Sequence, residues 1–429
     1  MSIFSKGRCH VSTLDGMSSF PLGGTYQGLA QQVRSSGQEQ GQMHMVPRIT
    51  LAGKYTIISS PQSSHSPSIL VLSASGSKHV VHVAPIRTHH LVRVTALAVD
   101  QSSRPTANLH IAACLSNGDI YVHELHSHPR RHYYAPPFKT PRTAPIIQVA
   151  YCHPVLVTLS ESFTLSVYDL AHEGIQLVHA LTSFTSYHPS SLVLTMPESQ
   201  TYKLILTYAS PVYPAHWSVG VTEVILSNAA LHAPTSAFTS PTRRPASLLL
   251  STRSTRAFDI PAGWIDEAKL GDVRDQWGRK VGSVAGTQTD GRWVVLAPAV
   301  QGEVRPPGGF TPASFPLQLY RLSSPPLRAG AGAAPKLTFV RSLLGQTGPV
   351  SSLALADGRC VSLGVDGKVW VWDLEKGRGA EVASSTSASS WTESGEDDPS
   401  TLRGTIAFDE RRIISAFATG DVTVRDFDM

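Results

Sequence analysis

The chain is poor in charge and in long apolar runs. Charged residues make up 16% of its 429 residues, against roughly 25% in an average globular protein, and the formal net charge of +5 is small for a chain that coats nucleic acid. No apolar run approaches the roughly 20 residues that span a bilayer. The N-terminal MSIFSKGRCHVSTLDG has no apolar stretch of the signal-peptide kind. The composition favours a globular protein without a membrane span.

Cysteine and asparagine are also scarce. The four cysteines never stand at C-x-x-C spacing, and three of them fall inside apolar, strand-like runs: Cys9, Cys114, Cys152 and Cys360 are the full set. We interpret them as small core side chains in a reducing compartment. No N-x-[ST] sequon occurs. Both observations agree with an intracellular protein, cytoplasmic or nuclear.

Helical periodicity is almost absent, and short runs rich in Val, Ile, Leu, Thr and Tyr take its place. Gly, Pro, Ser and Asp clusters separate these runs, as expected for an all-β chain. The runs cover residues 55–60, 68–75, 79–86, 94–99, 110–116, 120–125, 164–170, 203–209, 292–298, 317–322, 350–355, 368–374, 412–418 and 422–427.

Two C-terminal segments repeat without a gap at an offset of 53 residues: SLALADGRCVSLGVDGKVWVWDL begins at 352 and TIAFDERRIISAFATGDVTVRDF at 405. The alignment pairs Ser362 with Ser415 and Asp373 with Asp426. Weaker copies occur at 115–125, where His123 aligns with Trp372, at 160–170 and at 288–297. Self-similarity at such a period indicates a repeat architecture.

The pattern D-G followed by V-x-V-W-D resembles the WD-repeat family of β-propellers. The segment 345–350 resembles the start of such a repeat, with Gln346 in the position of the family's His, and His90 fits the same spacing. The resemblance covers roughly residues 50–428 and implies an all-β, seven-bladed propeller closed by an N-terminal strand. The seven units are expected near 54–89, 90–136, 144–184, 190–234, 280–343, 345–383 and 403–428.

The last unit has only three strands, so we predict that residues 46–53 (VPRITLAG) supply the fourth. A propeller whose ring is not closed leaves unpaired backbone groups. We expect a disordered segment over 1–45, rich in Gly, Ser and Gln, and a propeller over 46–429. Insertions are expected at 235–279, 301–315 and 384–402, all on one face of the propeller.

Within a blade, the resemblance makes several polar and aromatic residues structural braces rather than catalysts. It pairs His90 with Asn117, and Gln346 with Asp366, as buried hydrogen-bonding partners, and it places Trp372 and Asp373 at the family's Trp-Asp position. A Gln amide can still donate to a carboxylate.

Three functional alternatives remain open. The run HELHSHPRRH places His126 and His128 two residues apart, but no complete set of metal ligands accompanies them. No G-x-S-x-G turn occurs, so the sequence gives no support to nucleophilic catalysis. A propeller hydrolase, the second alternative, would need ionisable groups on the inner strands. We therefore expect no enzyme, cofactor or metal. Basic residues interleaved with aromatic ones can bind nucleic acid or phosphoinositide, or form a solvated loop or a docking patch for an acidic protein segment.

We therefore expect a non-catalytic protein–protein interaction scaffold or adaptor, with other proteins rather than nucleic acid as its partners. The inserted loops resemble those of fungal F-box proteins that carry a WD-repeat propeller. That resemblance implies a substrate-recognition subunit of a cullin-type ubiquitin ligase, bound through a Skp-type adaptor. Residues 1–45 contain no recognisable F-box pattern. The candidate partner-binding residues are Arg130, Arg131, Tyr133, Tyr134, Phe138, Lys139, Arg142, Arg243, Arg244, Arg305, Phe310 and Trp391.

Overall fold

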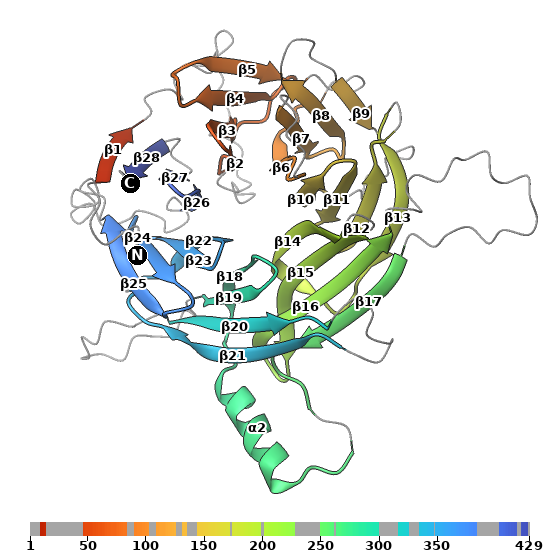
Figure 1. The fold of residues 1–429 in the computed structure, drawn as a ribbon, viewed down its shortest axis with the longest axis vertical. Helices are drawn as coiled ribbons and strands as arrows, with labels where there is room; N and C mark the ends of the chain where they lie inside the picture. Colours follow the sequence, from red (N-terminus) through yellow and green to blue (C-terminus); the bar gives the residue numbers. More distant parts are fainter. Residues whose placement is uncertain are drawn as a thin grey trace, which may run out of the picture. The chain divides into compact units, whose positions relative to one another are not determined.

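The structure is a computed structural model, shown in Figure 1. It describes residues 9–13, 46–83, 90–102, 109–125, 131–134, 144–171, 174–198, 201–227, 249–260, 263–299, 316–325, 334–346, 348–383, 403–417 and 422–427. These residues form seven four-stranded sheets, so the predicted all-β fold, a seven-bladed β-propeller closed by an N-terminal strand, is confirmed. None of the described helices is long and apolar enough to cross a membrane.

The chain divides into two units. The first unit, residues 1–93 and 389–429, contains two sheets. One sheet consists of β2 (Ile49–Ala52), β3 (Tyr55–Ser59), β4 (Ser68–Ser73) and β5 (Lys78–His82). The other consists of β26 (Gly404–Phe408), β27 (Arg412–Phe417), β28 (Val422–Phe427) and β1 (Cys9–Thr13).

The second unit, residues 94–388, contains five sheets. The second sheet consists of β6 (Val94–Val99), β7 (Leu109–Leu115), β8 (Ile120–Leu125) and β9 (Arg131–Tyr134), and the third of β10 (Ile146–Cys152), β11 (Val155–Ser160), β12 (Thr164–Asp169) and β13 (Gln176–Thr182). The fourth consists of β14 (Tyr187–Glu198), β15 (Thr201–Val212), β16 (His216–Ser227) and β17 (Leu249–Arg256), and the fifth of β18 (Val284–Thr289), β19 (Trp293–Pro298), β20 (Leu317–Ser323) and β21 (Lys336–Leu343). The sixth consists of β22 (Val350–Ala356), β23 (Arg359–Gly364), β24 (Val369–Asp373) and β25 (Arg378–Ala383).

Within a sheet, the burial of a strand depends on its position in the strand order. The second strand β11 is buried along nearly its whole length, whereas the outer strand β13 is mostly exposed. Sheets pack face to face, so one apolar cluster joins residues of β10–β12 with residues of β14–β16. Within the second unit the first strands lie side by side in chain order, β6 next to β10, β14, β18 and finally β22. Stacked neighbours thereby make the core continuous.

The strand that completes the last sheet is not the predicted one. Residues 9–13 form β1, which pairs antiparallel with β28 from Cys9↔Phe427 to Thr13↔Thr423. The predicted segment 46–53 instead contains β2, the first strand of its own sheet. That sheet would otherwise hold only three strands, which is why β2 cannot serve the last one. The prediction of disorder is also wrong for residues 9–13; the rest of 1–45 lies outside the described residues.

The predicted insertion 235–279 contains regular structure. Strand β17 pairs with β16 and completes the fourth sheet, and helix α2 (Glu267–Gly278) follows it. Strand β17 is therefore the outer strand of its sheet rather than part of an insertion. Residues 228–248, which include Arg243 and Arg244, lie outside the described residues, so the prediction that the insertions share one face stays a prediction. Residues 301–315 and 384–402 lie outside the described residues.

Candidate functional site

The polar residues of the sixth sheet gather inside the blade. The side chains of Gln346 and Ser362 are buried, and the Ser362 hydroxyl donates to Gln346 Oε1 at 2.5 Å. Asp366 Oδ1 accepts from the backbone N–H of Lys368 at 3.1 Å. A Cβ built on Gly364 would lie 2.2 Å from Asp366 Oδ1 and 2.9 Å from Gln346 Nε2, so both side chains converge on this glycine. The side chains of Gln346 and Asp366 therefore meet inside the blade; that they stabilise it stays a prediction.

In the same sheet, Trp372 packs in the core and Asp373 accepts hydrogen bonds from the turn that follows it. Trp372 is fully buried and stacks on Trp370 with ring centroids 5.8 Å apart. Asp373 Oδ1 accepts from the backbone N–H groups of Glu375 and Lys376. Burial acts to raise the pKa of Asp373, but the hydrogen bonds from Lys376 and Glu375 and the charge of Lys376 lower it overall.

The second predicted brace does not have the expected form. His90 is exposed, so it is not the buried partner that the repeat pattern predicts. Asn117 instead exchanges two hydrogen bonds with Asp119, donating from Nδ2 to Asp119 Oδ2 at 2.8 Å and accepting the Asp119 N–H at 3.1 Å. His123, at the position of Trp372, is 4% exposed and lies 6.2 Å from the ring of Tyr121.

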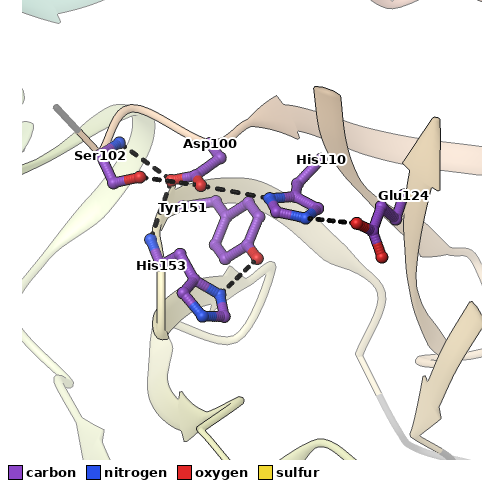
Figure 2. Close-up of polar contacts among 6 residues, drawn as sticks. All are labelled: Asp100, Ser102, His110, Glu124, Tyr151 and His153. Carbon is purple, nitrogen blue, oxygen red and sulfur yellow. Dashed lines mark hydrogen bonds and ion pairs between the residues drawn. The ribbon is translucent and has the colours of Figure 1, made fainter. Parts of the chain in front are cut away.

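A polar cluster joins the second and third sheets where β6 and β10 end (Figure 2). Asp100 follows β6 and accepts hydrogen bonds from the backbone N–H of His153, from the Ser102 N–H and from the Ser102 hydroxyl, all at 2.9 Å. His110 Nδ1 lies 3.4 Å from Asp100 Oδ2, and its Nε2 lies 3.8 Å from Glu124 Oε1. The cluster is completed by Tyr151, whose hydroxyl lies 3.1 Å from His153 Nδ1.

The charge state of this cluster follows from its contacts. Burial acts to raise the pKa of Asp100, but the hydrogen bonds from His110, His153 and Ser102 together lower it to about 2. The hydrogen bond to Asp100 raises the pKa of His110 against the effect of burial, and the charges of Asp100 and Glu124 add to the rise. Burial, assisted by Asp100, raises the pKa of Cys152 to about 11, which keeps this thiol protonated.

The cluster is not arranged for nucleophilic catalysis. In a catalytic triad the histidine stands between the serine and the carboxylate. Here Asp100 stands between Ser102 and His110, and both ring nitrogens of His110 face carboxylates. Among the described residues no group of three or more His, Cys, Asp or Glu side chains is placed to hold a metal ion. His126 and His128 lie outside those residues.

The structure describes few of the predicted partner-binding residues. Arg131, Tyr133 and Tyr134 lie on β9, which pairs with β8. The other candidates fall outside the described ranges: Arg130, Phe138, Lys139, Arg142, Arg243, Arg244, Arg305, Phe310 and Trp391. The basic patches therefore remain a sequence prediction.

An apolar surface around helix α2 was not predicted. We call Ile260, Trp264, Ile265, Leu270 and Trp277 the α2 surface. Trp264 is 86% exposed and Ile260 61% exposed, and no residue of the helix is buried. Figure 1 shows the helix standing away from the strands of its unit, beyond β20 and β21.

The base of the helix is held to the sheets. Trp217 on β16 exchanges two backbone hydrogen bonds with Val281, at 2.7 and 2.9 Å. The ring of Trp277 lies 5.8 Å from that of Phe258 and 6.2 Å from that of His216. These contacts fix where the helix leaves the propeller, while its N-terminal half remains uncovered.

The comparisons with known proteins agree with the propeller architecture. Residues 66–259, somewhat under half of the chain, match the family model described as "F-box protein pof12 beta-propeller". The matched part runs from β4 to the end of the fourth sheet, so α2 lies outside it. A search of curated proteins gave no match.

One similar solved structure is the crystal structure of the computationally designed Ika8 protein. It is 12% identical, with 90% of this chain and 98% of that chain covered and a TM-score of 0.39. Because this score is low, the fold assignment rests on the strand pairing above and not on that structure.

Proposed function

We propose that the protein is a non-catalytic scaffold that recognises other proteins and, more specifically, that it selects substrates for a cullin-type ubiquitin ligase. The observation that supports this proposal is the match of residues 66–259 to the propeller of an F-box protein. A rigid stack of sheets that carries partner-binding segments between its strands suits such a role. The polar cluster around Asp100 supports the non-catalytic part, because its geometry serves a contact between sheets.

The experiment uses the full-length chain with an affinity tag. We expect it to capture partner proteins from cells, to bind a purified Skp-type adaptor, and its depletion to lengthen the half-lives of the captured partners. Captured partners without adaptor binding or half-life change would overturn the ligase role and leave the scaffold role standing. Failure to capture any partner above an unrelated propeller protein would overturn both.

A further inference from the structure

Exposed apolar side chains concentrate on one part of the described chain. Fourteen large hydrophobic residues are exposed among the described residues, and the five of the α2 surface all fall between 260 and 277. A scattered exposed hydrophobic residue needs no explanation, but five of them within one short segment are the kind of concentration that marks an interaction site. The concentration therefore identifies the α2 surface as different from the rest of the described surface.

Hydrogen bonds order the backbone that carries the α2 surface. Asp266 caps the helix by accepting the Lys269 N–H on Oδ1 at 2.9 Å, and Lys269 Nζ donates to the Trp264 carbonyl at 3.2 Å. At the other end, the Asp259 N–H donates to Gln276 Oε1 at 3.1 Å. This ordered backbone lowers the entropy that the segment would lose on binding a partner.

The helix uses only part of its apolar stripe for contacts within the chain. Leu270, Val273 and Trp277 follow helical spacing along one side. Trp277 packs on Phe258, and Val273 is half-buried. Leu270 is 39% exposed, and Trp264 lies three residues before the first residue of the helix. The stripe therefore continues past the chain's own contacts onto an uncovered end.

The charges beside this uncovered end decide what would bind there. Residues 259–277, which span the α2 surface, hold five exposed carboxylates, one lysine and one exposed arginine, a local net charge of −3 in a chain of +5; the carboxylates are Asp259, Asp266, Glu267, Asp272 and Asp275. Lys269 is already paired with Asp266, its Nζ 3.4 Å from Oδ2. Nucleic acid, an anionic lipid surface and an acidic peptide would all be repelled, whereas a basic segment would be attracted.

We propose that the α2 surface docks a protein segment that combines a large apolar side chain with neighbouring Lys or Arg residues. The apolar side chain packs against Trp264, Ile260 and Leu270, and the basic residues face Asp259 and Glu267. This inference rests on the proposed scaffold function and adds the site and the chemistry of the partner.

The probe is a phage-displayed library of random peptides of about 12 residues, selected on the immobilised full-length protein after depletion on the Trp264→Ala variant. We expect the selected peptides to be rich in Trp, Phe, Leu or Ile together with Lys and Arg. Their affinity should fall at least about tenfold for Trp264→Ala. It should also fall as salt rises from about 0.05 to 0.5 M, because screening weakens exposed charge pairs.

Two further variants make the test decisive. Tyr213→Ala, which removes another 88% exposed aromatic residue, should bind the selected peptides as the wild type does. Glu267→Gln should weaken the binding of basic peptides, and both variants should keep the wild-type melting temperature. Acidic peptides, salt-independent binding, or no peptides that distinguish Trp264→Ala from wild type would overturn the proposal. Undiminished capture of cellular partners by Trp264→Ala would overturn this site while leaving the scaffold function intact.

Discussion

Asp100 accepts the backbone N–H of His153 across the boundary between two neighbouring sheets, at 2.9 Å. The same contact recurs in the fifth and sixth sheets, where Asp290 Oδ2 accepts the N–H of Gly358 at 3.2 Å. In the first unit Asp409 holds Arg412, whose guanidinium donates to the Gly53 carbonyl. In each case the aspartate directly follows the first strand of its sheet and fixes the first turn of the next sheet. We therefore interpret these three aspartates as hydrogen-bonding links between neighbouring blades, and we call each such link a clasp.

The first prediction concerns the strength of this clasp. We expect Asp100→Ala to lower the free energy of unfolding by about 2–3 kcal/mol, because His153 and Ser102 lose their buried acceptor. Urea unfolding of the full-length protein measures the change. Asp275→Ala, on the exposed helix α2, is the control and should change stability by less than about 0.5 kcal/mol. A similar small effect for Asp100→Ala would rule out the clasp.

The second prediction concerns pH. Asp100 has a folded pKa of about 2, below its ordinary 3.8, so its contribution is present above pH 3.8 and is lost as the pH falls toward 2. His110 has a folded pKa raised above 6.5, so its contribution is complete below pH 6.5 and is lost as the pH rises through the folded value. The cluster should therefore stabilise the protein most between pH 3.8 and 6.5.

Melting temperatures of the wild type and of His110→Gln measure this window. The difference between the two proteins should be larger near pH 5.5 than near pH 9, because only a protonated His110 is attracted to both carboxylates. Equal differences at the two pH values would show that the imidazolium charge contributes nothing.

The third prediction compares two glycines. Gly364→Ala should destabilise the protein by about 1–3 kcal/mol, because its Cβ would overlap Asp366 and Gln346. Gly271→Ala should leave the melting temperature unchanged or slightly raised, since nothing lies within 4 Å of its Cβ and alanine favours a helix by up to about 1 kcal/mol. Calorimetry of both variants checks the contrast, and equal melting temperatures would contradict the brace in the sixth sheet.

The fourth prediction concerns the closing strand. Deleting residues 1–13 should lower the melting temperature, because β28 then presents an unpaired edge. Deleting residues 1–8 leaves β1 intact and is the matched control. If both truncations melt together, the pairing of β1 with β28 contributes no stability.

The repeated strands could be predicted from sequence because each carries its own local pattern of apolar residues. Three elements could not: β1, helix α2, and β17, which lies inside the predicted insertion 235–279. Strand β1 has only five residues, and its partner β28 begins at residue 422. Helix α2 buries no residue, and its three large apolar residues, Leu270, Val273 and Trp277, are too few to predict a helix from sequence.

The contacts at the candidate sites also divide into those that the sequence predicts and those that it does not. The convergence of Gln346 and Asp366 follows the repeat pattern, whereas the exposure of His90 does not. The Asp100 clasp joins separate sheets, and strand periodicity does not report such contacts. An aspartate directly after the first strand, at 100, 290 and 409, is the signal that could have revealed it.

The pairing of β1 with β28 determines when this sheet can form during synthesis of the chain. Strand β1 is synthesised more than 400 residues before β28 and cannot pair with it until β28 has been made. A nascent chain halted before residue 422 therefore carries an orphan N-terminal strand and an incomplete final sheet, which are features that quality-control machinery recognises.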